Sequence, residues 1–151
     1  MSTSSTYVLD ASIIIKWFIP EIYWEQATLL QSIPGSSLHA PDFAQLECTS
    51  ILSKKVRRKE LQLNEANQIQ ELLLQMPVQM HPWQDLLLEA GRVAHETCRS
   101  VYDCLYLVLA KQLNGKMVTA DKKLYLTLKE SEDWSEYLLW IEDLNIESGG
   151  S

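Results

Sequence analysis

The fold class is decided near the start of the chain by Tyr7-Val8-Leu9-Asp10-Ala11-Ser12-Ile13-Ile14-Ile15-Lys16-Trp17-Phe18. Tyr7-Val8-Leu9 is typical of a short buried strand, and the residues from Ser12 to Phe18 predict a helix that Pro20 ends. A strand that passes within a few residues into a helix is the first step of an alternating pattern.

The same alternation continues through the rest of the chain. Further strands are predicted at residues 38–40, 78–80, 116–119 and 137–141, and helices at residues 23–33, 41–59, 64–75, 83–97, 101–113 and 122–130. Strands that alternate with helices through short connections indicate a parallel sheet covered on both faces. We therefore predict an α/β fold with three α/β/α layers and a small central parallel sheet.

Length and composition indicate one globular domain. The chain has 151 residues, of which 46% are hydrophobic and 22% are charged, so disordered, collagen-like and mini-protein classes are excluded. No apolar run reaches the ~18–20 residues that cross a bilayer, and the first residues do not have the pattern of a signal peptide. We predict a single cytoplasmic domain at residues 1–147, and a flexible tail at residues 148–151 of the kind that cloning can leave.

Charge is unevenly distributed along the chain. Thirteen Lys and Arg stand against 20 Asp and Glu, which gives a net charge of −7, and the stretch from Glu130 to Glu147 has seven acids and no Lys or Arg. The net charge therefore gives no support for a nucleic-acid partner. One local basic run could still contact RNA, although it is equally typical of a solvated helix end: Lys54, Lys55, Arg57, Arg58 and Lys59.

Several common site chemistries are excluded by what the sequence lacks. The five glycines form no phosphate-binding loop, and Asp10-Ala11-Ser12 lacks the second acid of an aspartyl-phosphate phosphatase. No nucleophile elbow accompanies the three histidines, which are predicted to be strand or surface residues: His39, His81 and His95. No zinc-ligand spacing joins the three cysteines, which are predicted to be free buried thiols: Cys48, Cys98 and Cys104.

Four carboxylates occupy unusual positions. Asp10 directly follows the strand residues Val8-Leu9, and Asp121 comes after the strand residues Met117-Val118, at a later strand end. Glu47 falls on the apolar side of its predicted helix, and Asp103 is the one charged residue in a helical stretch, residues 101–110, that is apolar almost all round. A charge in such a place costs free energy unless a partner compensates it.

Each acid taken singly has a structural alternative. Asp10 and Asp121 could be turn caps, Asp103 could be the capping-box partner of Ser100, and Glu47 could pair with a lysine. Taken together, the four occupy positions that a doubly wound sheet directs to one crevice beyond its strand ends. Four neighbouring carboxylates repel one another and favour a hard divalent cation, Mg²⁺ or Mn²⁺. Such a site serves phosphoryl or phosphodiester chemistry.

Four segments, each with one of these acids, follow one another between Tyr7 and Leu126. They are Val8-Leu9-Asp10-Ala11-Ser12, Ala40-Pro41-Asp42 with Glu47 six residues after the proline, Ser100-Val101-Tyr102-Asp103-Cys104-Leu105-Tyr106-Leu107, and Val118-Thr119-Ala120-Asp121. In order and spacing this series resembles the PIN domain family, in particular the VapC-type ribonuclease toxins of prokaryotic toxin–antitoxin pairs. Cys104 departs from the small residue common at its position, without touching the acids.

The resemblance implies a metal-dependent endoribonuclease that hydrolyses RNA phosphodiesters with a metal-activated water. It makes Asp10, Glu47, Asp103 and Asp121 the catalytic residues and the ligands of Mg²⁺ or Mn²⁺. Ser12 and Thr119 become polar neighbours of the site. It also implies a homodimer and an antitoxin protein as partner, while the lack of a long apolar run predicts no membrane contact. The alternative is a non-catalytic PIN-like module that binds a protein and holds a structural cation.

Overall fold

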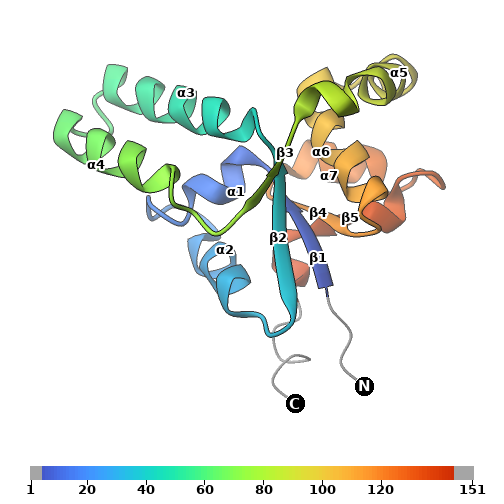
Figure 1. The fold of residues 1–151 in the computed structure, drawn as a ribbon, viewed down its shortest axis with the longest axis horizontal. Helices are drawn as coiled ribbons and strands as arrows, with labels where there is room; N and C mark the ends of the chain where they lie inside the picture. Colours follow the sequence, from blue (N-terminus) through green and yellow to red (C-terminus); the bar gives the residue numbers. More distant parts are fainter. Residues whose placement is uncertain (1–4, 145–151) are drawn as a thin grey trace.

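One parallel sheet organises the chain, whose computed structural model describes residues 5–144 (Figure 1). The strand order is β3-β2-β1-β4-β5, and every neighbouring pair runs parallel. Val8 in the central strand pairs with His39 on one side and with Met117 on the other. The strands are β1 (Ser5–Leu9), β2 (Ser36–Pro41), β3 (Gln79–His81), β4 (Lys116–Thr119) and β5 (Leu138–Trp140).

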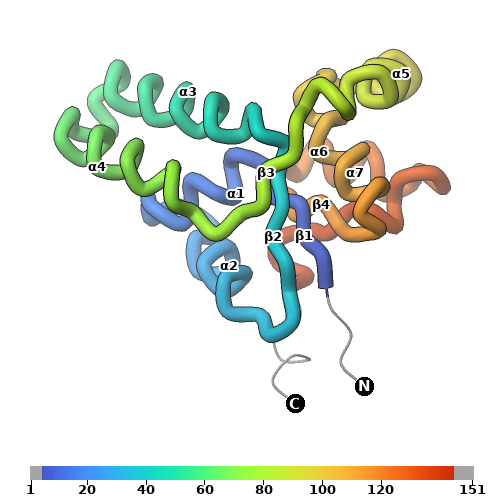
Figure 2. Tube along the Cα trace, viewed as in Figure 1, coloured from blue at the N-terminus to red at the C-terminus, as the bar shows by residue number. Residues whose placement is uncertain are grey.

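Helices cover both faces of this sheet, so the predicted three-layer α/β/α class is confirmed. Figure 1 shows α1 to α4 on one side of strands β1 and β2, and α5 to α7 on the other. In Figure 2 the chain leaves α4, passes through β3 in front of β2 and enters α5, so β3 connects the two helical layers. The helices are α1 (Ala11–Ile15), α2 (Trp24–Leu29), α3 (Ala44–Arg57), α4 (Leu63–Leu73), α5 (Leu87–Thr97), α6 (Val101–Gln112) and α7 (Lys122–Leu128).

Short 3₁₀ turns take up residues that the sequence placed in helices and strands. They are η1 (Leu30–Ser32), η2 (Trp83–Leu86), η3 (Ser135–Tyr137) and η4 (Ile141–Asp143). The helix predicted to reach Phe18 ends at Ile15, because the next backbone N–H groups bond three residues back rather than four, Trp17 to Ile14 and Phe18 to Ile15, both at 3.0 Å. The chain therefore tightens into a turn at Lys16.

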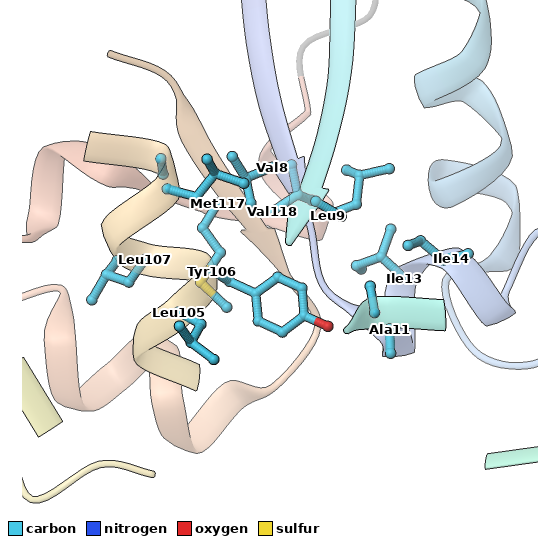
Figure 3. Close-up of a cluster of buried hydrophobic side chains, with 14 of the residues drawn as sticks. Val8, Leu9, Ala11, Ile13, Ile14, Leu105, Tyr106, Leu107, Met117 and Val118 are labelled. Carbon is cyan, nitrogen blue, oxygen red and sulfur yellow. The ribbon is translucent and has the colours of Figure 1, made fainter. Parts of the chain in front are cut away.

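Helix α6 forms the centre of the core, as its apolar sequence predicted. Seven consecutive residues, Cys104 to Ala110, are buried, and α6 packs against β1, β2 and β4. In Figure 3 the ring of Tyr106 extends from α6 toward Ala11 at the start of α1. The aromatic side chain thus reaches from the core to the end of the central strand.

A close backbone approach determines how α6 connects to β4. Asn114 has φ 53°, and a Cβ on Gly115 would lie 2.5 Å from the carbonyl oxygen of Thr6. Any other residue at position 115 would have to displace β1, because a contact that short is not tolerated against backbone. The Asn114-Gly115 stop signal therefore also brings β4 against β1.

Two further predictions concern cysteines and membranes. All three cysteines are free, and Cys48 and Cys104 are buried, but the prediction of a buried thiol is wrong for Cys98. Cys98 is exposed at the position that follows the last residue of α5, where the backbone is left-handed with φ 58°. Within residues 5–144 no helix is long and apolar enough to span a bilayer. The predicted domain end at residue 147 and the tail at residues 148–151 lie outside the described residues.

Candidate active site

Asp10 and Asp121 occupy equivalent positions at the ends of adjacent strands. Each directly precedes a helix and caps it: Oδ1 of Asp10 accepts a hydrogen bond from the N–H of Ile13 at 3.0 Å, and Oδ1 of Asp121 accepts one from the N–H of Leu124 at 3.0 Å. Because β1 and β4 are neighbours and run parallel, their carboxyl ends meet at one edge of the sheet. The capping alternative is therefore correct for both acids, and each cap uses Oδ1 alone.

Glu47 lies in the first turn of α3 and contacts α6. Its Oε1 accepts a hydrogen bond from the hydroxyl of Tyr106 at 2.5 Å. Tyr106 is 2% exposed, and burial together with the nearby Glu47 raises the pKa of its hydroxyl, which therefore stays protonated and donates. Among the described residues, Glu47 has this tyrosine as its partner and forms no ion pair with a lysine.

Asp103 lies in the first turn of α6 beside Arg99. The backbone N–H of Asp103 bonds to Oγ of Ser100 at 3.1 Å, so Ser100 caps the helix as its spacing predicted. The side chain of Asp103 takes another partner, since its Oδ2 lies 3.4 Å from a guanidinium nitrogen of Arg99. A half-buried ion pair of this kind holds the carboxylate at the helix start without sequestering it.

The four carboxylates line one pocket of about 300 Å³. We call it the acid pocket, and its lining residues are Asp10, Ala11, Ser12, Lys16, Glu47, Ile51, Asp103, Tyr106, Ala120 and Asp121. A larger cavity of about 740 Å³ lies along α5, the end of α6 and residues 132–137, and contains none of the predicted site residues. Two of the charged residues that line this cavity form an ion pair with each other, since Nζ of Lys111 lies 3.7 Å from Oε1 of Glu89.

Crowding and burial favour the neutral forms of three of these acids. Burial is the main cause that raises the pKa of Asp10 to about 6, with Asp103 and Glu47 adding to it against the hydrogen bonds from Ser12 and Ile13. Burial also raises the pKa of Glu47, and the charge of Asp103 adds to it. Burial raises the pKa of Asp103 despite the opposing effects of Ser100 and Arg99. The pocket therefore favours a compensating positive charge.

The donor set fits a hard cation. All four side chains offer carboxylate oxygens, which Mg²⁺ and Mn²⁺ prefer. Within residues 5–144, no group of three or more His, Cys, Asp or Glu side chains is already arranged to hold a metal ion. The predicted metal and catalytic roles of Asp10, Glu47, Asp103 and Asp121 stay predictions.

The predicted polar neighbours take different positions. Ser12 lines the acid pocket and donates a hydrogen bond from Oγ to Oδ1 of Asp10 at 2.6 Å. Thr119 is fully buried, and its Oγ1 accepts a hydrogen bond from the N–H of Asp121 at 3.0 Å. Ser12 therefore contacts the carboxylate of Asp10, whereas Thr119 contacts the backbone N–H of Asp121.

The predicted basic run lies at the end of α3. Lys54, Arg57, Arg58 and Lys59 are exposed, as either an RNA contact or a solvated helix end requires. Lys55 differs, because its Nζ lies 3.4 Å from Oε2 of Glu21 and 3.8 Å from Oε2 of Glu60. The RNA contact of this run therefore stays a prediction.

Sequence reasoning missed two polar residues of the acid pocket, Tyr106 and Lys16. Tyr106 follows Asp103 by three positions on one helix, a spacing that places both on the same side and could have been noticed. Lys16 is the one charged residue in the apolar stretch from Ile13 to Ile19. Its position next to the acids depends on the tight turn after Ile15, which the sequence pattern does not show.

Comparisons with known proteins bear on this arrangement. The family model named PIN domain matches residues 7–129. Ribonuclease VapC3 of Pyrobaculum aerophilum is 34% identical over 119 residues, which is 78% of this chain and 90% of that protein.

Two crystal structures resemble the fold. That of PAE2754 from Pyrobaculum aerophilum has a TM-score of 0.67 at 19% identity and covers 98% of both chains. That of VapBC2 from Rickettsia felis, bound to a DNA fragment from their promoter, has a TM-score of 0.61 at 13% identity and covers 89% of this chain and 98% of that one.

Proposed function

Because this chain belongs to the PIN domain family, we propose that it is a metal-dependent endoribonuclease and the toxin of a toxin–antitoxin pair. The observation that carries the proposal is the acid pocket, where four carboxylates from four separate segments line one space at the strand ends. The name of the 34% identical relative, Ribonuclease VapC3, supports RNA as the substrate.

The residues of the acid pocket have distinct parts in this proposal. Asp10, Glu47, Asp103 and Asp121 would hold Mg²⁺ or Mn²⁺, an ion that polarises the phosphodiester and lowers the pKa of a water molecule. Tyr106 orients Glu47, and Ser12 orients Asp10, each by one hydrogen bond. The N–H groups at the starts of α1 and α7 hold the two strand-end aspartates in place.

We infer that the same chain has protein partners, namely an antitoxin and a second copy of itself. Support comes from exposed leucines on separate helices, since large apolar side chains in contact with water favour burial in an interface. Leu46 on α3 is 72% exposed, and Leu88 on α5 is also 72% exposed. Helix α3 contributes Glu47 to the acid pocket, and α5 packs against α6, which contributes Asp103 and Tyr106.

An RNA cleavage assay tests the proposed function. The purified chain is incubated with single-stranded and stem-loop RNAs in MgCl₂, in MnCl₂ and in EDTA. We expect defined fragments in at least one metal and none in EDTA. Cleavage in EDTA would contradict metal dependence. Intact RNA in both metals, from a folded protein, would overturn the enzyme and favour the non-catalytic binding module.

A further inference from the structure

Lys16 is a buried cation beside the acid pocket. It follows α1 directly, its side chain is 7% exposed, and it lines the pocket together with the four carboxylates. Removing an ammonium group from water costs free energy that a partner must offset. A lysine kept in such a place has a structural partner, a ligand, or both.

The partner of Lys16 is not one of the four acids. Its Nζ donates to Oε1 of Glu21 at 3.1 Å, and among residues 5–144 it forms no ion pair with Asp10, Glu47, Asp103 or Asp121. An ammonium group has three N–H donors, and Glu21 accepts one of them. The positive charge therefore lies next to the carboxylates without being used to neutralise them.

Glu21 holds a second cation as well. Its Oε2 lies 3.4 Å from Nζ of Lys55, which belongs to the basic run at the end of α3. One carboxylate thus joins a lysine of the acid pocket to a lysine of the exposed basic surface. Lys16 and Lys55 therefore lie on opposite oxygens of the same carboxylate, which carries one negative charge against their two positive ones.

We propose that Lys16 binds a phosphate group of single-stranded RNA at the acid pocket and that Glu21 positions its ammonium group. This inference rests on the proposed function, because it concerns the substrate of the same site. A phosphodiester that approaches four carboxylates meets like charge, and a cation beside the pocket, in addition to the metal that the acids would hold, lowers this repulsion. Lysine is suited to this as a compact point charge on phosphate.

The rival explanation is that Lys16 and Glu21 are only a structural ion pair. The two explanations differ in what Glu21→Gln does. If the pair is only structural, Glu21→Gln and Lys16→Gln break it equally and affect RNA binding equally. If Lys16 binds phosphate, Glu21→Gln leaves the ammonium group in place and preserves the electrostatic contact.

The experiment measures RNA binding without cleavage. All variants carry Asp121→Asn, which removes one carboxylate of the pocket but keeps an oxygen to cap α7. Binding of a fluorescein-labelled single-stranded RNA is followed by anisotropy at fixed MgCl₂ over a series of KCl concentrations. Lys129, exposed at the far end of α7 over the ring of Tyr125, provides the matched control.

We expect Lys16→Gln to weaken binding about tenfold and to reduce the log–log salt slope by about 0.7, the value for one lost phosphate contact on a single strand. Glu21→Gln should keep the slope but weaken binding by less than Lys16→Gln does, because the ammonium group stays and loses only its positioning partner. Lys129→Gln should change neither quantity, and Lys16→Arg should restore the slope. Thermal melts check folding. If Lys16→Gln does not fold, the double variant Lys16→Gln with Glu21→Gln replaces it, because two neutral amides leave no unpaired charge.

Three results would overturn the inference: an unchanged slope in Lys16→Gln, equal losses in Lys16→Gln and Glu21→Gln, or no RNA binding by the Asp121→Asn protein at the lowest salt. The proposed function is judged separately, by cleavage with the wild-type chain. Wild-type cleavage with an unchanged Lys16→Gln slope would remove only the inference. Intact RNA in every metal would remove the proposed function itself.

Discussion

The hydroxyl of Tyr106 donates a hydrogen bond to Oε1 of Glu47 and so joins α6 to α3 across 59 positions of sequence. This bond lowers the pKa of Glu47, against the burial that raises it. Tyr106 therefore helps to keep Glu47 ionised, which is the form that a cation requires.

Replacing Tyr106 by Phe should destabilise the protein by about 1 to 3 kcal/mol, because a carboxylate loses its donor. Metal-dependent cleavage should also fall, since Glu47 then ionises less readily. Tyr102→Phe is the matched control, because Tyr102 lies on the same helix, is 58% exposed and has no hydrogen bond to an acid of the pocket. Equal unfolding midpoints in urea for the two variants would show that the Tyr106 hydroxyl contributes nothing.

Replacement of each pocket acid by its amide should lower RNA cleavage by orders of magnitude: Asp10→Asn, Glu47→Gln, Asp103→Asn and Asp121→Asn. Asp42→Asn and Asp85→Asn should keep nearly full activity, because neither lines the pocket. The measurement is the initial rate on one RNA in MnCl₂. Near-normal rates in two of the four pocket variants would be incompatible with a shared metal site.

Asp103→Asn should change stability differently with and without metal. In EDTA we expect it to melt no lower than wild type, because it removes one of four crowded negative charges. With Mn²⁺, wild type should gain about 2.7 kcal/mol at a hundredfold excess over Kd, and the variant should gain less. Thermal melts in both buffers measure this, and equal Mn²⁺ shifts for the two proteins would mean that Asp103 is not a ligand.

A separate prediction concerns the basic run at the end of α3 and the salt dependence of RNA binding. If Arg57, Arg58 and Lys59 contact phosphates, changing all three to Gln should reduce the log–log salt slope of RNA binding by about 2, at roughly 0.7 for each contact. The slope is measured by anisotropy over a KCl series. A slope equal to that of the unchanged protein would show that the run is a solvated helix end.

Stability should also depend on pH through a pair of histidines between β2 and β3. Nδ1 of His39 lies 2.9 Å from Nε2 of His81, and Nε2 of His39 lies 2.9 Å from Oγ of Ser37. Burial and the neighbouring His81 lower the pKa of His39 below its usual 6.5. A lowered pKa means that the unfolded chain binds the proton first, so stability is lost as the pH falls below 6.5 toward the pKa in the fold.

His39→Gln should therefore reduce the loss of melting temperature between about pH 7.5 and about pH 5.5, because Gln stays neutral. His95→Gln is the control, since His95 is exposed on α5. Melting temperatures for the three proteins in EDTA across this range provide the measurement. If His39→Gln loses as much melting temperature at low pH as wild type does, groups other than His39 cause the loss.

Features of the fold could be predicted where a physical rule links a position in the sequence to a location in the structure. Asp10 and Asp121 could be paired in advance because the carboxyl ends of adjacent parallel strands share one edge of the sheet. The burial of α6 could be predicted because its sequence has no polar side. These two predictions required only the hydrophobic periodicity of the sequence and the parallel direction of the strands.

Other features depend on contacts that no local pattern encodes. The bond between Tyr106 and Glu47 requires the final angle between α6 and α3. The contact of Lys16 with Glu21 requires the tight turn after Ile15, which competes with continuation of the helix. Cys98 was misplaced because the sequence does not show that α5 ends at Thr97 and leaves the next residue exposed.

The central position of β1 determines when the acid pocket can form during translation. The ribosome delivers β1 first, yet its second partner, β4, emerges only after α2 to α6 have been made. Asp121 comes two residues after the end of β4, so a nascent chain that ends before it lacks β5 and the full set of carboxylates. Pairing over such a separation is slow to form. During synthesis of this chain, the acid pocket is therefore complete only late, after β4 has paired with β1.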